Sequence, residues 1–273
     1  MSYVTSADIQ AAVRQLRLED KPLCVHSSLR SFGRVDGGAK AVIDGLLAEG
    51  STVLVPSFSS YFAIAPPEGM RPERNAWDYS VCWALPRSTR LRYTPSAGLI
   101  DSDMGALPVS MVSIPARSRG NHPLNSFMAL GPMAEELVQH QSPLDVYAPL
   151  SELSERDGYV VLMGVGLDRM TALHLAEQNA GRTLFRRWAD DLEGKPMMVA
   201  IGSCSNGSPN LDDVLAPLER RVIVGESLWR VFPLQETLTA AEKAMRDDPE
   251  ITRCDDRGCE RCNDAIAGGP ILA

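Results

Sequence analysis

The chain has no apolar run that approaches the roughly 20 residues of a membrane-spanning helix. Its first residues, MSYVTSADIQAAVRQL, contain no basic stretch followed by an apolar segment, so we expect no secretory signal peptide. Basic residues are outnumbered, because 27 Lys and Arg against 35 Asp and Glu leave a net charge of −8. This balance offers no electrostatic footprint for nucleic acid or an anionic membrane. We therefore expect a cytoplasmic protein that binds neither.

Histidine and cysteine are scarce, with 4 and 6 copies. Cysteines of a cytoplasmic protein stay reduced, so a group of them indicates a metal site or chance rather than a disulfide framework. The remaining composition, 44% hydrophobic and 23% charged, is typical of a globular protein. We expect a single domain over residues 1–273, with a cysteine-containing C-terminal extension at about 245–273.

Helical and extended patterns alternate in the first part of the chain. Residues 5–18 combine a capping residue with helix-spaced apolar positions, and 37–50 form a second helical segment between glycines. Apolar runs at 21–29 and 51–59 are typical of buried strands. The strand–helix–strand order predicts a parallel crossover within a largely parallel sheet.

Regular patterns return only after a long interruption. Residues 61–115 are rich in proline and aromatic side chains, and an irregular region of this length in a compact domain is usually functional. A helix is then predicted at 132–141 and a strand at 158–166.

The loop HSSLRSFGRVDGG, residues 26–38, lies between a predicted strand and helix. Gly33, Gly37 and Gly38 permit close approach of the backbone, and a helix start offers free N–H groups to an anion. Arg30 and Arg34 add charged donors for phosphate. The pattern leaves two interpretations open, a phosphate cradle and an ordinary glycine-rich turn.

Two further stretches carry histidine. In HPLNSFMALGP, His122 precedes a proline and Ser126 precedes a helix as a possible cap, which by itself indicates no function. In RMTALHLAE, Thr171, His174 and Glu177 follow at spacings of three, which places them on one face of a helix. A histidine among apolar neighbours is more often a core residue, but one beside a carboxylate also suits proton transfer.

Four motifs occur together and in order: VHSSLRSFGRVDGG, VLVPSFS, HPLNSFMALGP and VLMGVGLDRMTALHLAE. In this combination the chain resembles the aminoglycoside 3-N-acetyltransferase family from about residue 7 to about residue 240. The resemblance implies a layered α/β/α sandwich with a central mixed, mainly parallel sheet. It also implies acetyl-coenzyme A as acetyl donor and the amine of a small molecule as acceptor.

The resemblance assigns roles to the motif residues. It implies His174 as general base, Glu177 as its carboxylate partner and Thr171 as a donor to the thioester oxygen. An imidazole can take a proton from an attacking amine near pH 7, which typically contributes about 10²- to 10⁴-fold. The implied contacts to acetyl-coenzyme A are Ser27, Ser28, Leu29, Arg30, Ser31, Phe32, Gly33, Val35, Gly37, Gly38, His122, Ser126 and Phe127.

One segment departs from the family pattern. Residues 202–206 read GSCSN, where the aminoglycoside enzymes carry paired aspartates that meet cationic sugar amines. Arg186 and Arg187 precede this segment and have the opposite charge. We therefore expect that a polycationic acceptor finds few counter-charges here.

The end of the chain carries CDDRGCERC, with Cys254, Cys259 and Cys262. Three thiolates need a fourth ligand for tetrahedral zinc, and Cys204 or a histidine would have to supply it. The sequence thus allows a structural zinc with Cys204 as fourth ligand, or an acidic tail with incidental cysteines.

Three functions remain open from the sequence. The first is an acetyl-coenzyme A-dependent N-acetyltransferase in which a small-molecule amine attacks directly and His174 is the base. The second is another coenzyme A-dependent acyltransferase, or a thioesterase in which His174 activates water. The third is a coenzyme A-binding protein without acceptor turnover, against which the His174–Glu177 pair argues. The chain is compatible with a monomer or a homodimer.

Overall fold

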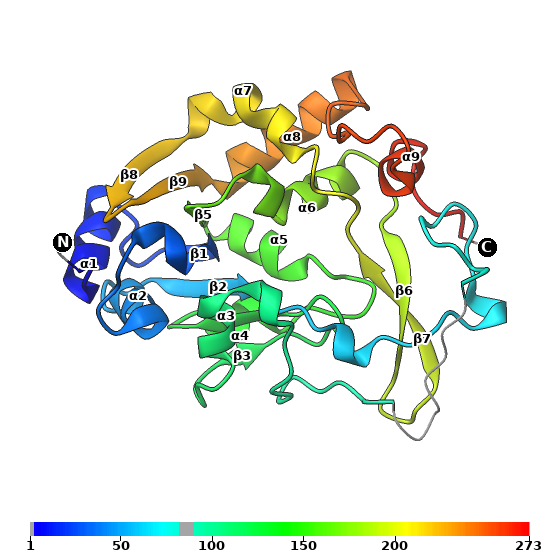
Figure 1. Ribbon diagram of the computed structural model, residues 1–273, viewed down its shortest axis with the longest axis horizontal. Helices are drawn as coiled ribbons and strands as arrows, with labels where there is room; N and C mark the ends of the chain where they lie inside the picture. The colour runs from blue at the N-terminus through cyan, green and yellow to red at the C-terminus, as the bar shows by residue number, and fades with distance from the viewer. Residues whose placement is uncertain (1–2, 82–89, 273) are drawn as a thin grey trace.

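The computed structural model describes residues 3–81 and 90–272. In this part of the chain the helices are α1 (Ser6–Gln15), α2 (Gly38–Leu47), α3 (Ala106–Met111), α4 (Ala134–Val138), α5 (Ala148–Glu155), α6 (Ala172–Asn179), α7 (Asp212–Leu215), α8 (Leu234–Asp247) and α9 (Glu260–Ile266). The strands are β1 (Pro22–Ser27), β2 (Thr52–Pro56), β3 (Ser118–Arg119), β4 (Phe127–Leu130), β5 (Tyr159–Met163), β6 (Phe185–Asp190), β7 (Pro196–Ile201), β8 (Arg220–Val224) and β9 (Ser227–Pro233). Figure 1 labels most of them along the ribbon. None of the described helices has both the length and the apolar character needed to cross a membrane.

The predicted helices and strands of the first 60 residues are confirmed. Helix α1 begins with a capping box, in which the Thr5 hydroxyl accepts from the Asp8 N–H and the Asp8 carboxylate accepts from the Thr5 N–H. Strand β1 then runs parallel to β2, with α2 as the connection between them. The helix predicted at 132–141 corresponds to α4, and the strand at 158–166 to β5.

The main sheet of the described residues has seven strands in the order β3-β4-β2-β1-β5-β9-β8. It is mixed, as predicted, but only the β1–β2 and β1–β5 pairings are parallel, and the others are antiparallel. The expectation of a mainly parallel sheet is therefore wrong. Connection length explains one of these pairings, because β8 and β9 are joined by the tight turn 225–226 and so short a connection forces antiparallel pairing. The β2–β4 and β5–β9 pairings instead join strands that are far apart in the chain.

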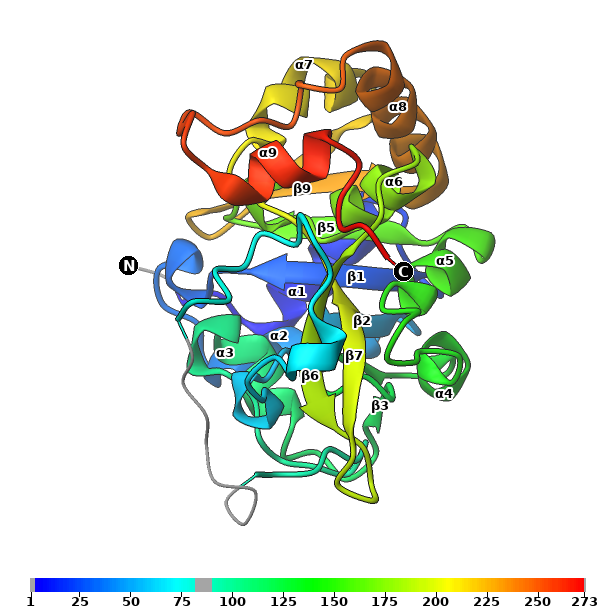
Figure 2. The ribbon, with the colours of Figure 1, turned by 90° about the vertical axis from the view of Figure 1, so that its right-hand side faces the viewer.

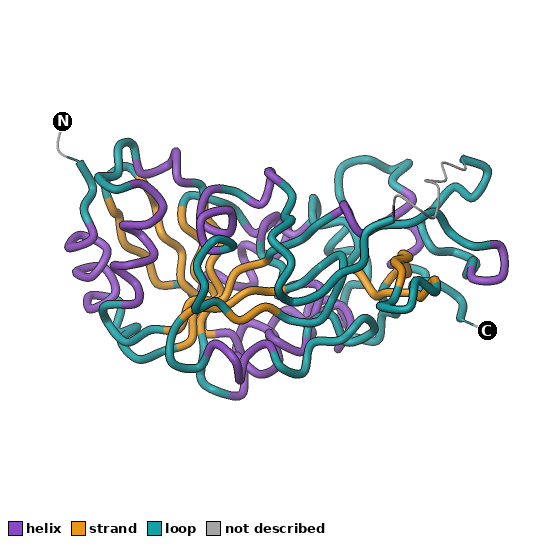
Figure 3. Tube along the Cα trace, turned by 90° about the horizontal axis from the view of Figure 1, so that it is seen from below, coloured by secondary structure: helices purple, strands orange, loops and turns teal. Residues whose placement is uncertain are grey.

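Helices cover both faces of this sheet, which confirms the layered α/β/α arrangement (Figures 1 and 3). On β5, Val160 and Leu162 pack into the core with α4, α5, α6 and α8, whereas Val161 and Met163 pack into the core with α1, α2 and α3. This alternation follows from the two-residue period of a strand. The central strands are consequently buried on both sides.

Strands β6 and β7 pair with each other as a separate hairpin outside the main sheet. Figure 2 shows this hairpin with α9 beyond one of its ends. Part of the irregular region 61–115 packs on it, and the Ile64 N–H donates to the Trp188 carbonyl (2.9 Å). Residues 82–89 of that region lie outside the described residues.

Candidate active site

A cleft of about 1310 Å³ opens where the three parallel strands end. His26 and Ser27 from β1, Pro56 from β2 and Gly164 just after β5 contribute to its wall. Loop segments diverge at the carboxyl ends of parallel strands, so α/β proteins commonly bind ligands at this edge. The beginning of α6 and residues 201–203 after β7 also line this cleft.

His174 and Glu177 lie one turn apart on α6, and the expected pairing is present. Nδ1 of His174 is 2.7 Å from Oε2 of Glu177. A carboxylate only accepts, so Nδ1 holds the proton of a neutral imidazole and Nε2 presents a lone pair. His174 lines the cleft, whereas Glu177 is only 4% exposed. The pair is thus arranged as a base with a buried orienting carboxylate.

The surroundings of Glu177 keep its carboxylate ionised. Burial by itself raises the pKa of this carboxyl, but the hydrogen bonds from His174 and Ser203 and the charges of His174 and Arg182 outweigh it and leave the pKa below its ordinary value. Nη1 of Arg182 lies 2.5 Å from Oε1, and the Ser203 hydroxyl donates to Oε2 at 2.7 Å. The sequence did not indicate Arg182 or Ser203, because both reach Glu177 only through the fold.

The imidazole of His174 is confined by Tyr147 and Gly202. The Tyr147 and His174 rings are stacked, with centroids 6.4 Å apart and planes inclined by 18°. A Cβ on Gly202 would lie 2.5 Å from the Tyr147 hydroxyl and 2.7 Å from the imidazole ring. Glycine at 202 is therefore a steric requirement of the site.

Thr171 is the residue that immediately precedes α6, and it lines the cleft together with His174. The side chain is partly exposed to the cavity. This position agrees with the predicted side of the helix, and the proposed donation to a thioester oxygen stays a prediction.

The loop predicted to hold acetyl-coenzyme A meets the cleft only in its first half. Residues 27–30 line the cavity, and Leu29–Phe32 form a short 3-10 helix. Phe32 is a core side chain, 1% exposed and packed edge-on against Trp229, and it does not line the cleft, so its expected cofactor contact stays a prediction. The cofactor assignments of the other loop residues outside the cleft wall stay predictions. These residues are Ser31, Gly33, Val35, Gly37 and Gly38.

His122 does not line the cleft, contrary to expectation. It is fully buried; its Nε2 donates to the Ala200 carbonyl (2.9 Å), and its Nδ1 accepts from the N–H groups of Leu124 and Asn125. Burial lowers the pKa of His122 to about 4, so it is neutral. It ties its own loop to β7 and thereby places Asn125, which does line the cleft.

Ser126 and Phe127 are likewise buried behind the cleft rather than within it. The Ser126 hydroxyl accepts from Nε of Arg119 (2.9 Å), and Phe127 packs edge-on against Phe58. Neither side chain lines the cleft, because the backbone enters the buried strand β4 here, and their predicted contacts with the cofactor stay predictions. The motif thus supports the cleft wall from behind, and its Asn125 lines the cleft.

Charged side chains of both signs reach the cleft. The carboxylates are Asp103 and Asp168, and the cations are Arg30, Arg169 and Arg261. Asp168 is already paired with Arg169, whose Nε lies 3.3 Å from its carboxylate. Asp168 and Arg169 stand just before Thr171 in the sequence, so their place at the cleft could have been predicted from the same motif. Arg261 lies on α9, and no sequence pattern indicated that it reaches the cleft.

A second cavity of about 300 Å³ adjoins the first and shares Phe58, Asp103 and Asn125 with it. Its aromatic wall includes Trp77, and the guanidinium of Arg187 lies 4.7 Å from the centre of the Trp77 ring. The long irregular region thus contributes to the site, as its length suggested.

The four cysteines proposed as zinc ligands come together in space. The Sγ atoms of Cys204, Cys254, Cys259 and Cys262 all lie within 4.8 Å of one another. Cys204 follows β7, whereas the other three belong to the C-terminal segment around α9. Of the two sources considered for the fourth ligand, the structure brings in Cys204.

The structure thus combines a layered α/β/α fold with a histidine–carboxylate pair at the wall of its cleft. The family model described as aminoglycoside 3-N-acetyltransferase matches residues 24–246. The chain belongs to the aminoglycoside 3-N-acetyltransferase family and is an N-acetyltransferase.

Several curated proteins are similar to this chain. The SPbeta prophage-derived aminoglycoside N(3')-acetyltransferase-like protein YokD of Bacillus subtilis (strain 168) is 34% identical over 241 residues, which cover 80% of this chain and 84% of that protein. Aminoglycoside N(3)-acetyltransferase IX of Micromonospora chalcea is 32% identical over 182 residues, which cover 64% of this chain and 62% of the relative.

Solved structures share the fold over most of the chain. The apoenzyme of aminoglycoside acetyltransferase AAC(3)-IVa superimposes with a TM-score of 0.78 at 25% identity and covers 98% of both chains. The YokD protein from Bacillus subtilis gives a TM-score of 0.72 at 28% identity, over 89% of this chain and 100% of that one. A binary complex of AAC-IIIb with CoASH has a TM-score of 0.72 at 21% identity, over 90% of this chain and 97% of that one.

Proposed function

We propose that the protein transfers the acetyl group of acetyl-coenzyme A to the amine of a small-molecule acceptor by direct attack, with His174 as general base. The observation that carries the proposal is the 2.7 Å contact between His174 and the buried, ionised Glu177 at the wall of the cleft. Family membership supplies the reaction type, and the structure of a relative named as a complex with CoASH supports the donor.

In the proposed reaction Nε2 of His174 takes a proton from a neutral amine as the amine nitrogen bonds to the thioester carbonyl carbon. Glu177 stabilises the imidazolium through Nδ1. When the carbon–sulfur bond breaks, His174 passes the proton to the leaving sulfur, so that the imidazole is neutral again. Thr171 donates to the thioester oxygen, where negative charge develops.

The dimensions of the cleft support two substrates. Its volume of about 1310 Å³ exceeds the roughly 300–1,000 Å³ usual for one drug-sized ligand. Arg30 lies at the wall formed by β1 and its loop, which suits a phosphate-bearing donor, while residues 201–203 and Asp103 lie in other parts of the wall. An acceptor therefore has room beside the donor.

The first test of this proposal is coenzyme A binding, measured by thermal shift. At 100 times Kd, a ligand stabilises the native state by about 2.7 kcal/mol, which corresponds to about 5 °C or more for a chain of this size. Arg30→Gln should reduce the shift, because Arg30 lines the cleft. Arg34→Gln is the matched control, because Arg34 stacks over Tyr3 instead. No shift in the wild type would contradict the proposal.

The acceptor requirement separates the transferase from its alternatives. Thiol release from acetyl-coenzyme A should depend on an added amine, and mass spectrometry should find the acceptor heavier by one acetyl group. Equal thiol release without amine would indicate the thioesterase, and binding without release would indicate a coenzyme A-binding protein. Aminoglycosides and amino-acid amines belong in the acceptor screen, since several relatives are named for aminoglycosides.

The cysteine cluster suits a structural zinc ion. With Zn–S bonds of about 2.3 Å, tetrahedral geometry separates the sulfurs by about 3.8 Å, and here all four lie within 4.8 Å of one another. Zinc would join the segment after β7 to the C-terminal segment and leave no open position for catalysis. The proposed role is therefore structural.

Metal analysis tests the zinc directly. The purified protein is expected to contain one zinc per chain, and Cys204→Ser should lose most of it because a four-thiolate site loses one ligand. Cys24→Ala is the matched control, since Cys24 is a buried thiol on β1 outside the cluster. A wild-type protein purified without chelators that holds no zinc would overturn the assignment.

A further inference from the structure

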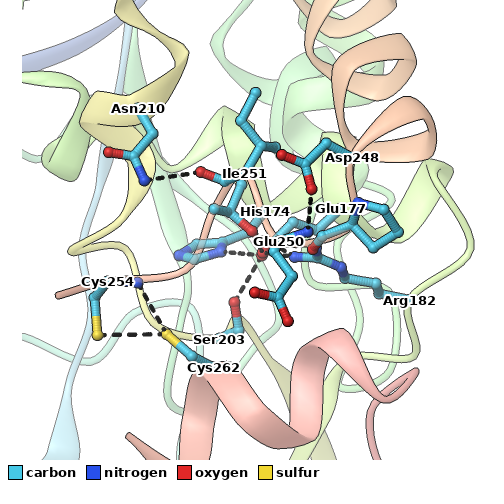
Figure 4. A network of polar contacts seen from close by, with 12 residues as sticks. His174, Glu177, Arg182, Ser203, Asn210, Asp248, Glu250, Ile251, Cys254 and Cys262 are labelled. Carbon is cyan, nitrogen blue, oxygen red and sulfur yellow. Dashed lines mark hydrogen bonds and ion pairs between the residues drawn. The ribbon is translucent and has the colours of Figure 1, made fainter. Parts of the chain in front are cut away.

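The carboxylate of Glu177 is held by groups from three separate parts of the chain. Oε2 accepts from His174 and from the Ser203 hydroxyl (2.7 Å), while Oε1 accepts from Arg182 (2.5 Å). The Thr252 hydroxyl lies 3.4 Å from Oε1 and accepts from Nη1 of Arg182 at 2.7 Å. Figure 4 shows this network around His174, Glu177, Arg182 and Ser203.

Both hydroxyl groups stand next to cysteines of the four-sulfur cluster. Ser203 immediately precedes Cys204, and Thr252 lies two residues before Cys254. Cys204 and Cys254 belong to segments far apart in the sequence, and their sulfurs meet in the cluster. The cluster thus joins the two backbones that carry the partners of Glu177.

Those two segments have no strand ladder of their own. Residues 202–207 and 248–258 consist of turns and irregular backbone. They lie against each other closely, because a Cβ on Gly207 would be 2.1 Å from the Thr252 carbonyl oxygen. Single side chains add to the contact, such as Asn210, which donates to the Ile251 carbonyl (3.0 Å). Irregular segments with few contacts open more readily than core strands, so a cross-link between them has a large effect on their order.

We infer that the four-cysteine cluster, with its metal bound, positions the catalytic pair by clamping Ser203 and Thr252 around Glu177. The inference rests on the proposed base and the proposed zinc, and it adds a connection between them. Ser203 and Thr252 act as positioning residues, because the hydroxyl group of each is directed at the Glu177 carboxylate. The site would then depend on the metal for the orientation of His174 and not only for the stability of the C-terminal segment.

The hydroxyl groups test the connection without touching the metal. Ser203→Ala and Thr252→Val should each keep one zinc per chain and the coenzyme A thermal shift, yet lower kcat about tenfold, as loss of an outer-shell partner typically does. Ser203→Thr, which keeps a hydroxyl, should restore most of the activity. Thr239→Val is the control, since the Thr239 hydroxyl on α8 donates only to a carbonyl of its own helix.

A double-mutant cycle tests whether the cluster acts through Glu177. Zinc removal or Cys254→Ser should lower kcat about tenfold in the wild type but change it by less than about twofold in Glu177→Gln, because the group being positioned is already lost. Equal losses in both backgrounds, or a parallel loss of coenzyme A binding, would overturn the inference and leave the cluster as a staple of the fold.

The tests of the inference, of the proposed base and of the proposed zinc remain distinguishable even if one variant does not fold. Should Cys254→Ser fail to fold, Ser203→Ala and Thr252→Val still decide, since they retain all four cysteines. Unchanged kcat in both hydroxyl variants would overturn the inference. The proposed base fails in a different way, namely if His174→Ala keeps its turnover, and the proposed zinc fails if the wild type carries none.

Discussion

His174→Ala is expected to lower kcat by about 100-fold or more, because general-base catalysis typically contributes about 10²- to 10⁴-fold. Coenzyme A affinity should remain nearly unchanged, since the Arg30 loop and not His174 is proposed to bind the donor phosphates. Steady-state kinetics on the best acceptor, combined with the coenzyme A thermal shift, measure the two effects separately. A fall in kcat with an intact thermal shift identifies a proton-transfer role.

His140→Ala is the matched control, because His140 is a surface histidine with 63% side-chain exposure. Glu177→Gln should be milder than His174→Ala, since an amide keeps the shape but no longer stabilises the imidazolium. If His174→Ala retains turnover within a few-fold of the wild type, the histidine is a structural residue and another base must be sought.

Polycationic aminoglycosides are expected to be acetylated with KM values about a hundredfold above that of a monoamine acceptor. Transfer of an ammonium group from water into the cleft without a counter-charge costs roughly 3 kcal/mol of binding free energy. Each 1.4 kcal/mol corresponds to a tenfold change in affinity. The cleft offers the carboxylates Asp103 and Asp168, but Asp168 is paired with Arg169, and Arg30 and Arg261 add further positive charge. The segment 202–206 contains no acidic residue, and its Gly202, Ser203 and Ser205 line part of this wall.

Charge variants make this prediction specific. Asp103→Asn should raise KM for gentamicin- and kanamycin-type acceptors further, because it removes a counter-charge. Arg261→Gln should lower KM for the same acceptors. Both substitutions should change KM for an acceptor with a single amine group less strongly. Asp103 and Arg261 come from segments that are far apart in the sequence, and both line the cleft. Micromolar KM values for aminoglycosides in the wild type would contradict the prediction while leaving the acetyltransferase proposal standing.

Local patterns were sufficient for much of the fold. The capping residue before α1 and the apolar runs of β1, β2 and β5 mark elements whose stability depends on neighbours in the sequence or on burial of the whole run. The relative direction of the strands could not be predicted in this way. The antiparallel pairings of β2 with β4 and of β5 with β9 join strands that are distant in the chain, and no local pattern encodes which of them meet.

The residues of the candidate site likewise fall into those that local sequence patterns predict and those that only the fold places. His174 and Glu177 were predictable as a pair, because helix geometry alone places positions three apart on one face. His122, Ser126 and Phe127 were assigned to the cofactor from motif resemblance, but the fold buries their side chains behind the cleft wall. A motif marks a segment that the site needs, but it does not say which side of the backbone faces the ligand.

The sequence by itself determined the family, from four motifs that occur in order along the chain, and it also determined the central helices and strands and the histidine–carboxylate pair, which depend on residues close together in the sequence. Only the tertiary structure decided what surrounds that pair. Ser203, Thr252 and Arg261 reach the site from segments that are distant in the chain, and Cys204 meets the C-terminal cysteines in the same way. Such contacts form when the completed core brings separate loops to one edge of the sheet, so their geometry is a property of the packed fold.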